Sequence, residues 1–240
     1  MLDGSTYYLN QSEARGIRST SDLAHFAAQE EGCYTELLLP FLPAEKSAAI
    51  YEAATGPGIL QFWLKSQGFI NLDGSDFSEN EAKMASEVNP RVVHGDSVAD
   101  LETRFQPDSL SAIIALDFFE HVPRERFRDF LAIAASRLRK GGVLILRGPN
   151  ADSPFVGLNL YNDITHVWAY TTVCLRALIL IAGFERVCFS DDTLKAIHQQ
   201  RWWKYPLMYV AQKFLHAICL AATRQHVTLW GSSIYVYAYR

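Results

Sequence analysis

Between residues 48 and 147, short apolar runs alternate with segments in which apolar residues recur every three or four positions. Short apolar runs of strand length predict strands at 48–54, 69–75, 91–94, 110–116 and 143–147. Apolar residues spaced three and four apart predict helices between them, at 59–67, at 79–87 and from Pro123 to Leu138. The chain is therefore expected to alternate strand and helix, with a further helix between the third and fourth strands.

This alternation predicts a doubly wound, Rossmann-like α/β fold with a mostly parallel sheet. The run LSAIIAL at 110–116 is almost wholly apolar, as expected of a parallel strand that is buried on both faces. A helix at 174–182 and strands at 184–189 and 232–239 complete a predicted seven-stranded sheet.

One domain over 1–240 is the predicted organisation. We expect an N-terminal helical cap at 1–47, a cofactor-binding core at 48–190, a helical insertion at 191–230 and the last strand at 231–240.

Composition narrows the functional class. The formal charge of −4 gives no electrostatic reason to expect nucleic acid as a partner. The four cysteines are far apart without zinc-site spacing, which predicts reduced, buried thiols in a cytoplasmic protein. The N-terminal stretch lacks the apolar core of a signal sequence, and no apolar run reaches the length of a spanning helix.

The stretch AIYEAATGPGIL at 49–60 carries the strongest chemical signal. An apolar strand ends at Glu52, a turn of small residues runs to Gly58, and a helix begins at Ile59. Glycines in such a turn allow positive φ and let a ligand approach the backbone. The segment therefore predicts a nucleotide-like cofactor site.

Acids follow three successive predicted strands, namely Glu52, Asp76 and Asp96. The carboxyl ends of strands are where open α/β sheets bind their ligands. Asp76 lies 24 residues after Glu52, close to the spacing at which an acid reaches a ribose diol. A nicotinamide dinucleotide site would need a glycine three residues after Gly58, where this chain has Gln61. The pattern thus favours a cofactor that has no pyrophosphate.

In their order along the chain, the motifs resemble those of class I S-adenosylmethionine-dependent methyltransferases, in particular the small-molecule branch. The motifs are EAATGPG (52–58), GSDFS (74–78), HGDS (94–97), IIALDFFEHVP (113–123), RLRKGGVLILRGPN (137–150) and DITHVWAYT (163–171) followed by AGF (182–184). The resemblance implies S-adenosylmethionine as cofactor, with Asp76 on the ribose, Asp96 near the adenine amine and Asp117 beside the methionine part. The full set of implied cofactor-binding residues is Glu52, Ala53, Thr55, Gly56, Gly58, Asp76, Phe77, Asp96, Ser97, Asp117 and His121.

Two positions depart from the family pattern. Ala54 stands at the first glycine of the turn, where alanine costs little provided that φ stays negative. Ser111 replaces an acid that usually precedes the fourth strand, a position whose role is mostly structural.

Methyl transfer from a sulfonium is an in-line displacement, and a hydroxyl acceptor also needs a base. His166, oriented by Asp163, is the candidate base; the alternative is that His166 only holds a loop or the substrate. His121 has a second interpretation, in which it braces the loop before Pro123. No metal site is predicted at Asp163 and His166, because no third ligand is obvious nearby.

The segment 201–224 combines Trp202 and Trp203 with basic neighbours and one apolar helical face. A helix packed on the sheet or at a homodimer seam is favoured over a lid or peripheral membrane anchor. The predicted activity is O-methylation of a small molecule or a glycan or lipid intermediate. The alternatives are an inactive cofactor-binding partner and a membrane-surface interaction protein on the same fold.

Overall fold

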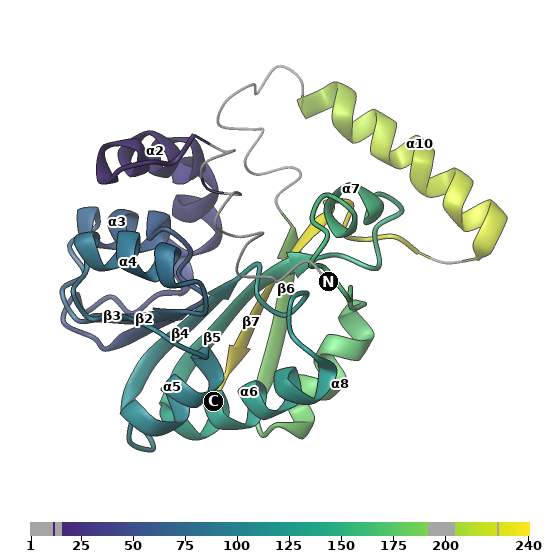
Figure 1. Cartoon of the computed structure of the whole chain (residues 1–240). Coiled ribbons are helices and arrows are strands. Elements are labelled where there is room, and N and C mark those ends of the chain that lie inside the picture. The colour runs from purple at the N-terminus through teal and green to yellow at the C-terminus, as the bar shows by residue number, and fades with distance from the viewer. Residues whose placement is uncertain (1–11, 13–15, 192–204, 225) are drawn as a thin grey trace.

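The computed structural model describes residue 12 and residues 16–191, 205–224 and 226–240. Its centre is a seven-stranded sheet in the order β3-β2-β1-β4-β5-β7-β6 (Figure 1). Only β7 runs antiparallel to its neighbours, β5 and β6, among the pairings that the described residues make. The strands are β1 (Ile50–Ala53), β2 (Leu72–Asp76), β3 (Val92–His94), β4 (Leu110–Leu116), β5 (Leu138–Pro149), β6 (Arg186–Asp191) and β7 (Ser233–Tyr239).

Helices cover both faces of the sheet, which confirms the doubly wound α/β prediction. One face carries α2, α3 and α4, and the other carries α5, α6 and α8 (Figure 1). Their bounds are α2 (Thr20–Leu37), α3 (Ile59–Ser66), α4 (Glu79–Val88), α5 (Ser97–Arg104), α6 (Arg124–Arg137) and α8 (Thr172–Ile181); η1 (Leu39–Phe41) follows α2, and α7 (Gly157–Leu160) follows β5.

Strand residues point alternately into the two helical layers. Ile114 belongs to the core shared with α2 and α3, whereas Ile113 belongs to the core shared with α5, α6 and α8. Because both faces are covered, β4 is buried along almost its whole length. The apolar run of the fourth strand is therefore explained by its central place in the sheet.

The two halves of the sheet diverge at β1 and β4. The chain builds outward from β1 to β2 and β3, then returns to place β4 on the other side of β1. A crevice at the carboxyl ends of the strands follows from this reversal, and open sheets bind ligands there. The predicted acids all lie at or just beyond these strand ends.

Several predicted boundaries shift. β2 begins at Leu72 rather than residue 69, since Phe69 belongs to the loop that follows α3. α6 ends at Arg137, because Leu138 pairs with Leu110 as the start of β5. The pair Gly141-Gly142 consequently lies inside β5, next to the register shift between β4 and β5.

The long helix α10 (Tyr205–Thr223) lies between β6 and β7, where an insertion was predicted. It stands at the periphery of the molecule (Figure 1), and Leu207 and Phe214 are 73% and 67% exposed. The prediction that this apolar face packs on the sheet is therefore wrong, because the described sheet is already covered by other helices. The dimer seam and the membrane anchor stay predictions; Trp202 and Trp203 lie outside the described residues.

Within the described part of the chain, no helix has the length and apolar character needed to cross a membrane. None of the four cysteines is buried, so the prediction that they are buried is wrong. Cys174 and Cys188 are exposed, since they lie in the first turn of α8 and on the outer side of edge strand β6.

Gly148 provides a test of the packing between β5 and the segment after β4. A Cβ atom at Gly148 would lie 2.3 Å from Cζ of the buried Phe119 ring. We expect Gly148→Ala to lower the free energy of unfolding by about 1–3 kcal/mol through overpacking, measured by urea denaturation. Gly95→Ala is the control, because nothing lies within 4 Å of a Cβ there; equal losses in both variants would contradict this packing.

Candidate functional site

The turn after β1 is built from three residues with left-handed backbone. Ala54, Gly56 and Gly58 have φ of +55°, +52° and +96°. Gly58 is also required by packing, since a Cβ there would lie 2.9 Å from Cα of Ala85 in α4. The sequence analysis expected alanine to cost little at position 54 if φ were negative, but φ of Ala54 is positive. In this left-handed conformation the Cβ atom crowds the following carbonyl oxygen.

Hydroxyl groups from two strands and a helix brace this turn. The backbone N–H of Ala54 donates to Oγ of Ser97 over 3.1 Å. Ser75 donates to the same oxygen over 2.9 Å, and the Tyr51 hydroxyl lies 2.6 Å from Ser75 Oγ. Ser97, assigned to the cofactor by resemblance, therefore has a visible second role in fixing the turn. Ser75 and Tyr51 were missed by the sequence analysis.

Asp76 lies across from the turn at the end of β2. Its carboxylate accepts hydrogen bonds from the backbone N–H of Gly56 at 2.7 Å and of Ser78 at 2.8 Å. Burial raises the pKa of Asp76 above its ordinary value, although these two bonds oppose the shift. Each oxygen keeps a further lone pair, which is what a ribose diol requires of a carboxylate. Ser78 occupies the N-cap of α4, but its side chain makes no capping bond.

Glu52 is buried beneath the turn, on the side of α3. Its carboxyl group accepts a hydrogen bond of 2.8 Å from Nε2 of Gln61, and Asn89 in turn donates to Gln61. Burial raises the pKa of Glu52 to about 8. Gln61 stands where a dinucleotide site would need a glycine, and here it bonds Glu52 to α3. In this position Glu52 supports the turn from below.

Asp96 is partly exposed after β3 and caps α5. One oxygen, Oδ1, accepts from the N–H groups of Val98 and Ala99, each at 2.9 Å, and from Arg126 at 2.7 Å. Burial raises the pKa of Asp96, but the bonds from Arg126 and the backbone outweigh it and lower the net value. These bonds all use Oδ1, so Oδ2 is the oxygen that can face an adenine amine.

The remaining cofactor candidates differ in exposure. The Phe77 ring is 66% exposed beside Asp76, whereas Ala53 and Thr55 are buried. The Thr55 methyl group fills the space over Gly74, where a Cβ would lie 2.5 Å from it. Thr55 and Ala53 therefore shape the turn from within, and Phe77 presents an open face.

Asp117 follows β4 with φ of +51° and is held by an arginine that the sequence analysis did not single out. Arg147, near the end of β5, makes a bidentate ion pair with the Asp117 carboxylate. Glu30 of α2 lies 3.6 Å from the same guanidinium. Although burial opposes its charge, the negative charge of Asp117 raises the pKa of Arg147. An arginine at a strand end carries no periodic signal, so only the fold reveals this pair.

Two histidines and a glutamate meet beyond Asp117, and we call them the Glu120 cluster: Glu120, His121 and His166. One possible ligand atom from each residue lies within 4.8 Å of the others. Nε2 of His166 is 3.9 Å from Oε1 of Glu120, and the two imidazole rings pack edge to face at 4.6 Å. The premise that no third ligand lies near His166 is therefore wrong, because the loop before α8 folds back over the segment after β4.

Backbone and side-chain bonds hold the two rings of the cluster. Nδ1 of His166 lies 3.0 Å from the carbonyl oxygen of Asn159, and Nδ1 of His121 lies 2.8 Å from Oγ1 of Thr165. Asp163 accepts hydrogen bonds from the N–H and hydroxyl groups of Thr165. The Asn159 carbonyl oxygen is thus the group at Nδ1 of His166, and Asp163 supports His121 through Thr165. The role of Asp163 in orienting His166 stays a prediction.

Burial dominates the electrostatics of the cluster. The Glu120 side chain is fully buried, and burial followed by the nearby Asp117 charge raises its pKa well above the ordinary value. Burial, and then the charge that His166 can carry, lowers the pKa of His121 to about 4. His121 is thus a neutral imidazole near neutral pH. The residue Glu120 stands within the quoted motif IIALDFFEHVP, but no spacing rule marked it as functional.

Asn150, the last residue of the motif RLRKGGVLILRGPN, binds backbone groups. It is buried, and its side-chain nitrogen donates to the carbonyl groups of Leu229 and Gly231. Ser111 accepts a bond of 2.9 Å from Arg139, which fits a structural role for that position.

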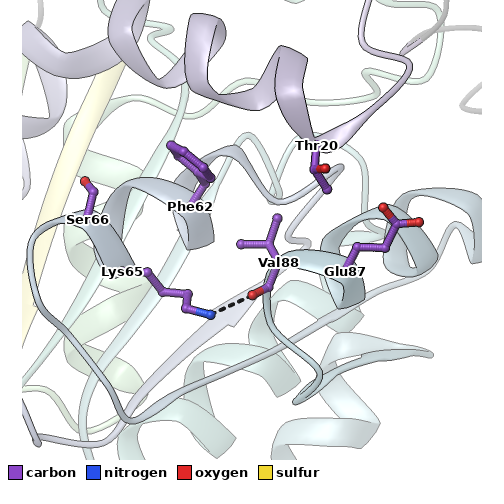
Figure 2. Close-up of a pocket in the computed structure, with 6 residues that line it drawn as sticks. All are labelled: Thr20, Phe62, Lys65, Ser66, Glu87 and Val88. Carbon is purple, nitrogen blue, oxygen red and sulfur yellow. Dashed lines mark hydrogen bonds between the residues drawn. The ribbon is translucent and has the colours of Figure 1, made fainter.

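A groove of about 630 Å³ lies elsewhere, between α2, α3 and α4 (Figure 2). Lys65 closes part of it by donating to the carbonyl oxygen of Val88 over 2.7 Å. The C-terminal ends of α3 and α4 line the groove, and they lie at the edge of the sheet opposite the carboxyl ends of the strands. The groove is therefore separate from the glycine turn. Its lining residues are Thr20, Phe62, Lys65, Ser66, Glu87 and Val88.

Fold and site together define a doubly wound α/β protein that has a glycine turn and a buried carboxylate, Asp76, at its topological switch point. The model of the methyltransferase-domain family matches residues 25–227. The chain belongs to this family and is an S-adenosylmethionine-dependent methyltransferase.

Solved structures share the fold at low sequence identity. An S-adenosylmethionine-dependent methyltransferase of Archaeoglobus fulgidus has a TM-score of 0.71 at 18% identity, over 98% of this chain and 99% of that one. A phosphoethanolamine N-methyltransferase of Haemonchus contortus has 0.60 at 14%, over 87% and 52%. A geranyl diphosphate C-methyltransferase of Streptomyces coelicolor has 0.58 at 14%, over 88% and 79%. No curated protein matches the chain.

Ala54 should be a strained position that glycine relieves. We expect Ala54→Gly to raise the free energy of unfolding by up to about 1 kcal/mol, because the left-handed conformation penalises a Cβ by that order. The matched control is Ala53→Gly in β1, which should instead lose about 1 kcal/mol or more, since the backbone there is extended. Urea denaturation of both variants is the measurement, and a loss in both would contradict the strain.

Glu52 should make stability fall with rising pH. Its pKa is about 8 in the folded protein and 4.5 ordinarily, so the folded state binds this proton more tightly. The resulting stabilisation is complete below the ordinary pKa and is lost as pH rises to about 8. Glu52→Gln keeps an oxygen for Gln61 but has no proton to lose.

The variant should therefore gain stability relative to wild type as the pH is raised from about 5 to about 9 in urea denaturation. Glu102→Gln, an exposed acid on α5, is the control with the same chemical change. Parallel curves for Glu52→Gln and wild type would show that this carboxyl group is ionised in both states.

Proposed function

We propose that this methyltransferase moves the methyl group of S-adenosylmethionine to a hydroxyl oxygen of a small molecule or of a glycan or lipid intermediate. The observation that carries the proposal is the place of the Glu120 cluster. Glu120 is three residues beyond Asp117, so the cluster is on the side of the crevice where the resemblance puts the methionine end of the cofactor. An imidazole there serves an acceptor that must lose a proton.

The cofactor is proposed to bind along the carboxyl ends of β1 to β4. Asp76 accepts hydrogen bonds from the two ribose hydroxyl groups. Asp96 faces the adenine amine through Oδ2, and the exposed Phe77 ring stacks on the base. The turn at Gly56 and Gly58 gives the backbone room for close approach. Asp117, fixed by Arg147, then faces the ammonium group of the methionine part, which a carboxylate attracts.

In the transfer, the acceptor oxygen attacks the methyl carbon in line with sulfur. A new O–C bond forms as the C–S bond breaks, and the electron pair of that bond stays on sulfur, giving S-adenosylhomocysteine. The acceptor's proton goes to Nε2 of His166, whose Nδ1 is already engaged with the Asn159 carbonyl. Glu120, 3.9 Å from Nε2, stabilises the imidazolium that results.

Fold likeness alone leaves the acceptor atom open. Among the similar structures, one is named for methylation of nitrogen and another for methylation of carbon. An amine acceptor needs only its neutral form, whereas a hydroxyl needs activation. The paired imidazoles beside a buried acid are what favours oxygen here.

Cofactor binding and acceptor class can be tested in one series. We expect wild type to bind S-adenosylhomocysteine in titration calorimetry and Asp76→Ala to lose at least about 100-fold in affinity, since the ribose loses both hydrogen bonds. Glu102→Ala is the control, an exposed acid removed from α5 with the same change in charge. Transfer of labelled methyl from S-adenosylmethionine is then scanned over phenols, free sugars and prenol-linked sugars, with matched amines.

Label on the hydroxyl compounds, reduced about 100-fold or more in His166→Gln at unchanged cofactor affinity, would support O-methylation. Label on the amines alone would overturn it. Tight cofactor binding with no transfer to any compound would favour the alternative of an inactive cofactor-binding partner protein.

A further inference from the structure

Glu120 is a buried acid whose two carboxylate oxygens lack any hydrogen-bond partner. The side chain is fully buried, and its Oε1 lies 3.9 Å from Nε2 of His166. Leaving a carboxylate in this state is costly, so such a group either keeps its proton, the direction in which burial moves the pKa of Glu120, or is paired, hydrated or bound to a cation. The residues around Glu120 therefore have to account for it.

The neighbouring imidazoles present the right atoms for a cation. Because the Asn159 carbonyl is only an acceptor, Nδ1 of His166 carries the proton and Nε2 carries the lone pair. Thr165 gives its hydroxyl proton to Asp163, so it accepts from Nδ1 of His121, and the lone pair of that ring is also on Nε2. Both Nδ1–H groups are thus bonded to oxygen, as metal-binding histidines usually are.

We propose that Glu120, His121 and His166 bind a divalent transition-metal cation beside the methyl-transfer site. Two imidazole nitrogens and one carboxylate suit Zn²⁺, Fe²⁺, Co²⁺ or Mn²⁺ better than Mg²⁺ or Ca²⁺, which prefer oxygen. Ligand atoms around such an ion lie roughly 3–4 Å apart, since each metal–ligand bond is about 2.1 Å. The three ligand atoms, within 4.8 Å of one another, reach that spacing by small side-chain rotations.

Supporting contacts make the cluster rigid. The backbone N–H of Val167 donates to the Glu120 carbonyl over 2.8 Å, which ties the loop of His166 to the segment of Glu120 and His121. Asp163 and Thr165 fix one ring, and the Asn159 carbonyl fixes the other. Three protein ligands leave coordination positions open for the acceptor.

The cation deepens the proposed function and rests on it for its chemical role. An ion held by these residues would lower the pKa of a hydroxyl group bound to it. It would thereby supply the activation that proton transfer to His166 supplies in the metal-free site. His166 is then a ligand, and the open positions favour acceptors that chelate, such as those with neighbouring oxygens. Binding of the metal itself does not depend on the acceptor.

The experiment uses untagged full-length protein that has been freed of metal and titrated with Co²⁺. We expect one Co²⁺ per chain and visible d–d absorption, and we expect Glu120→Gln and His166→Gln each to lower the affinity by about 100-fold or more. The control is His25→Gln, an exposed histidine of α2 that bonds Gln29 and should bind Co²⁺ as wild type does. Elemental analysis of protein purified without chelator identifies the resident metal.

S-adenosylhomocysteine affinity, measured on the same samples, separates the two proposals. Unchanged cofactor binding with lost Co²⁺ binding in both variants supports the metal site, and it also shows that the variants are folded. Weak Co²⁺ binding to wild type, or binding that persists in both variants, would overturn the site while leaving the cofactor assignment intact. Loss of cofactor binding by wild type would instead remove the proposed function.

Discussion

The hydrogen bond from the Gly56 amide to the Asp76 carboxylate joins the two elements on which the rest of the site depends. It can form only because the backbone after β1 turns left-handed, and because β2 ends beside β1 in parallel register. Ser97 holds the same turn from the other side, through the amide of Ala54. A buried Glu52 supports it from below through Gln61. The geometry of the glycine turn is thus fixed by contacts from β2, α3 and α5, which is how a folded chain maintains a strained turn.

Periodicity and turn chemistry were enough to predict the succession of strands and helices along the chain. The apolar runs of the buried strands and the spacing of apolar residues in the helices are visible in the sequence. They also placed Asp76 at the end of β2, beside the glycine turn. Ends of elements were harder: Leu138 reads as helix by apolar spacing, yet pairing with Leu110 draws it into β5. The exposed face of α10 was misjudged for a related reason. An apolar helical stripe indicates that something covers it, but not which surface does so.

Contacts between distant segments account for what the sequence could not supply. Asp117 and Arg147 are 30 residues apart, and His121 and Thr165 are 44 apart. No local pattern links such partners; they meet because β4 and β5 are adjacent strands and because the loop before α8 returns over the end of β4. Asp163 illustrates the limit well. Its sequence distance to His166 suggested a direct pair, but the turn between them gives the carboxylate to Thr165 and the ring to Asn159.

In the Glu120 cluster, one lone pair on His166 has two possible uses: it can accept a proton or bind a metal ion. A proton acceptor works best where water or substrate can receive the proton afterwards, whereas a ligand works best where the ring is fixed and dry. The His166 side chain is only 6% exposed and its Nδ1 is tethered to backbone, which favours a fixed role. The Glu120 carboxyl group is fully buried, neither of its oxygens has a hydrogen-bond partner, and burial raises its pKa well above the ordinary value. A divalent ion in direct contact with the carboxylate resolves both features at once, and it leaves activation of the acceptor to the metal.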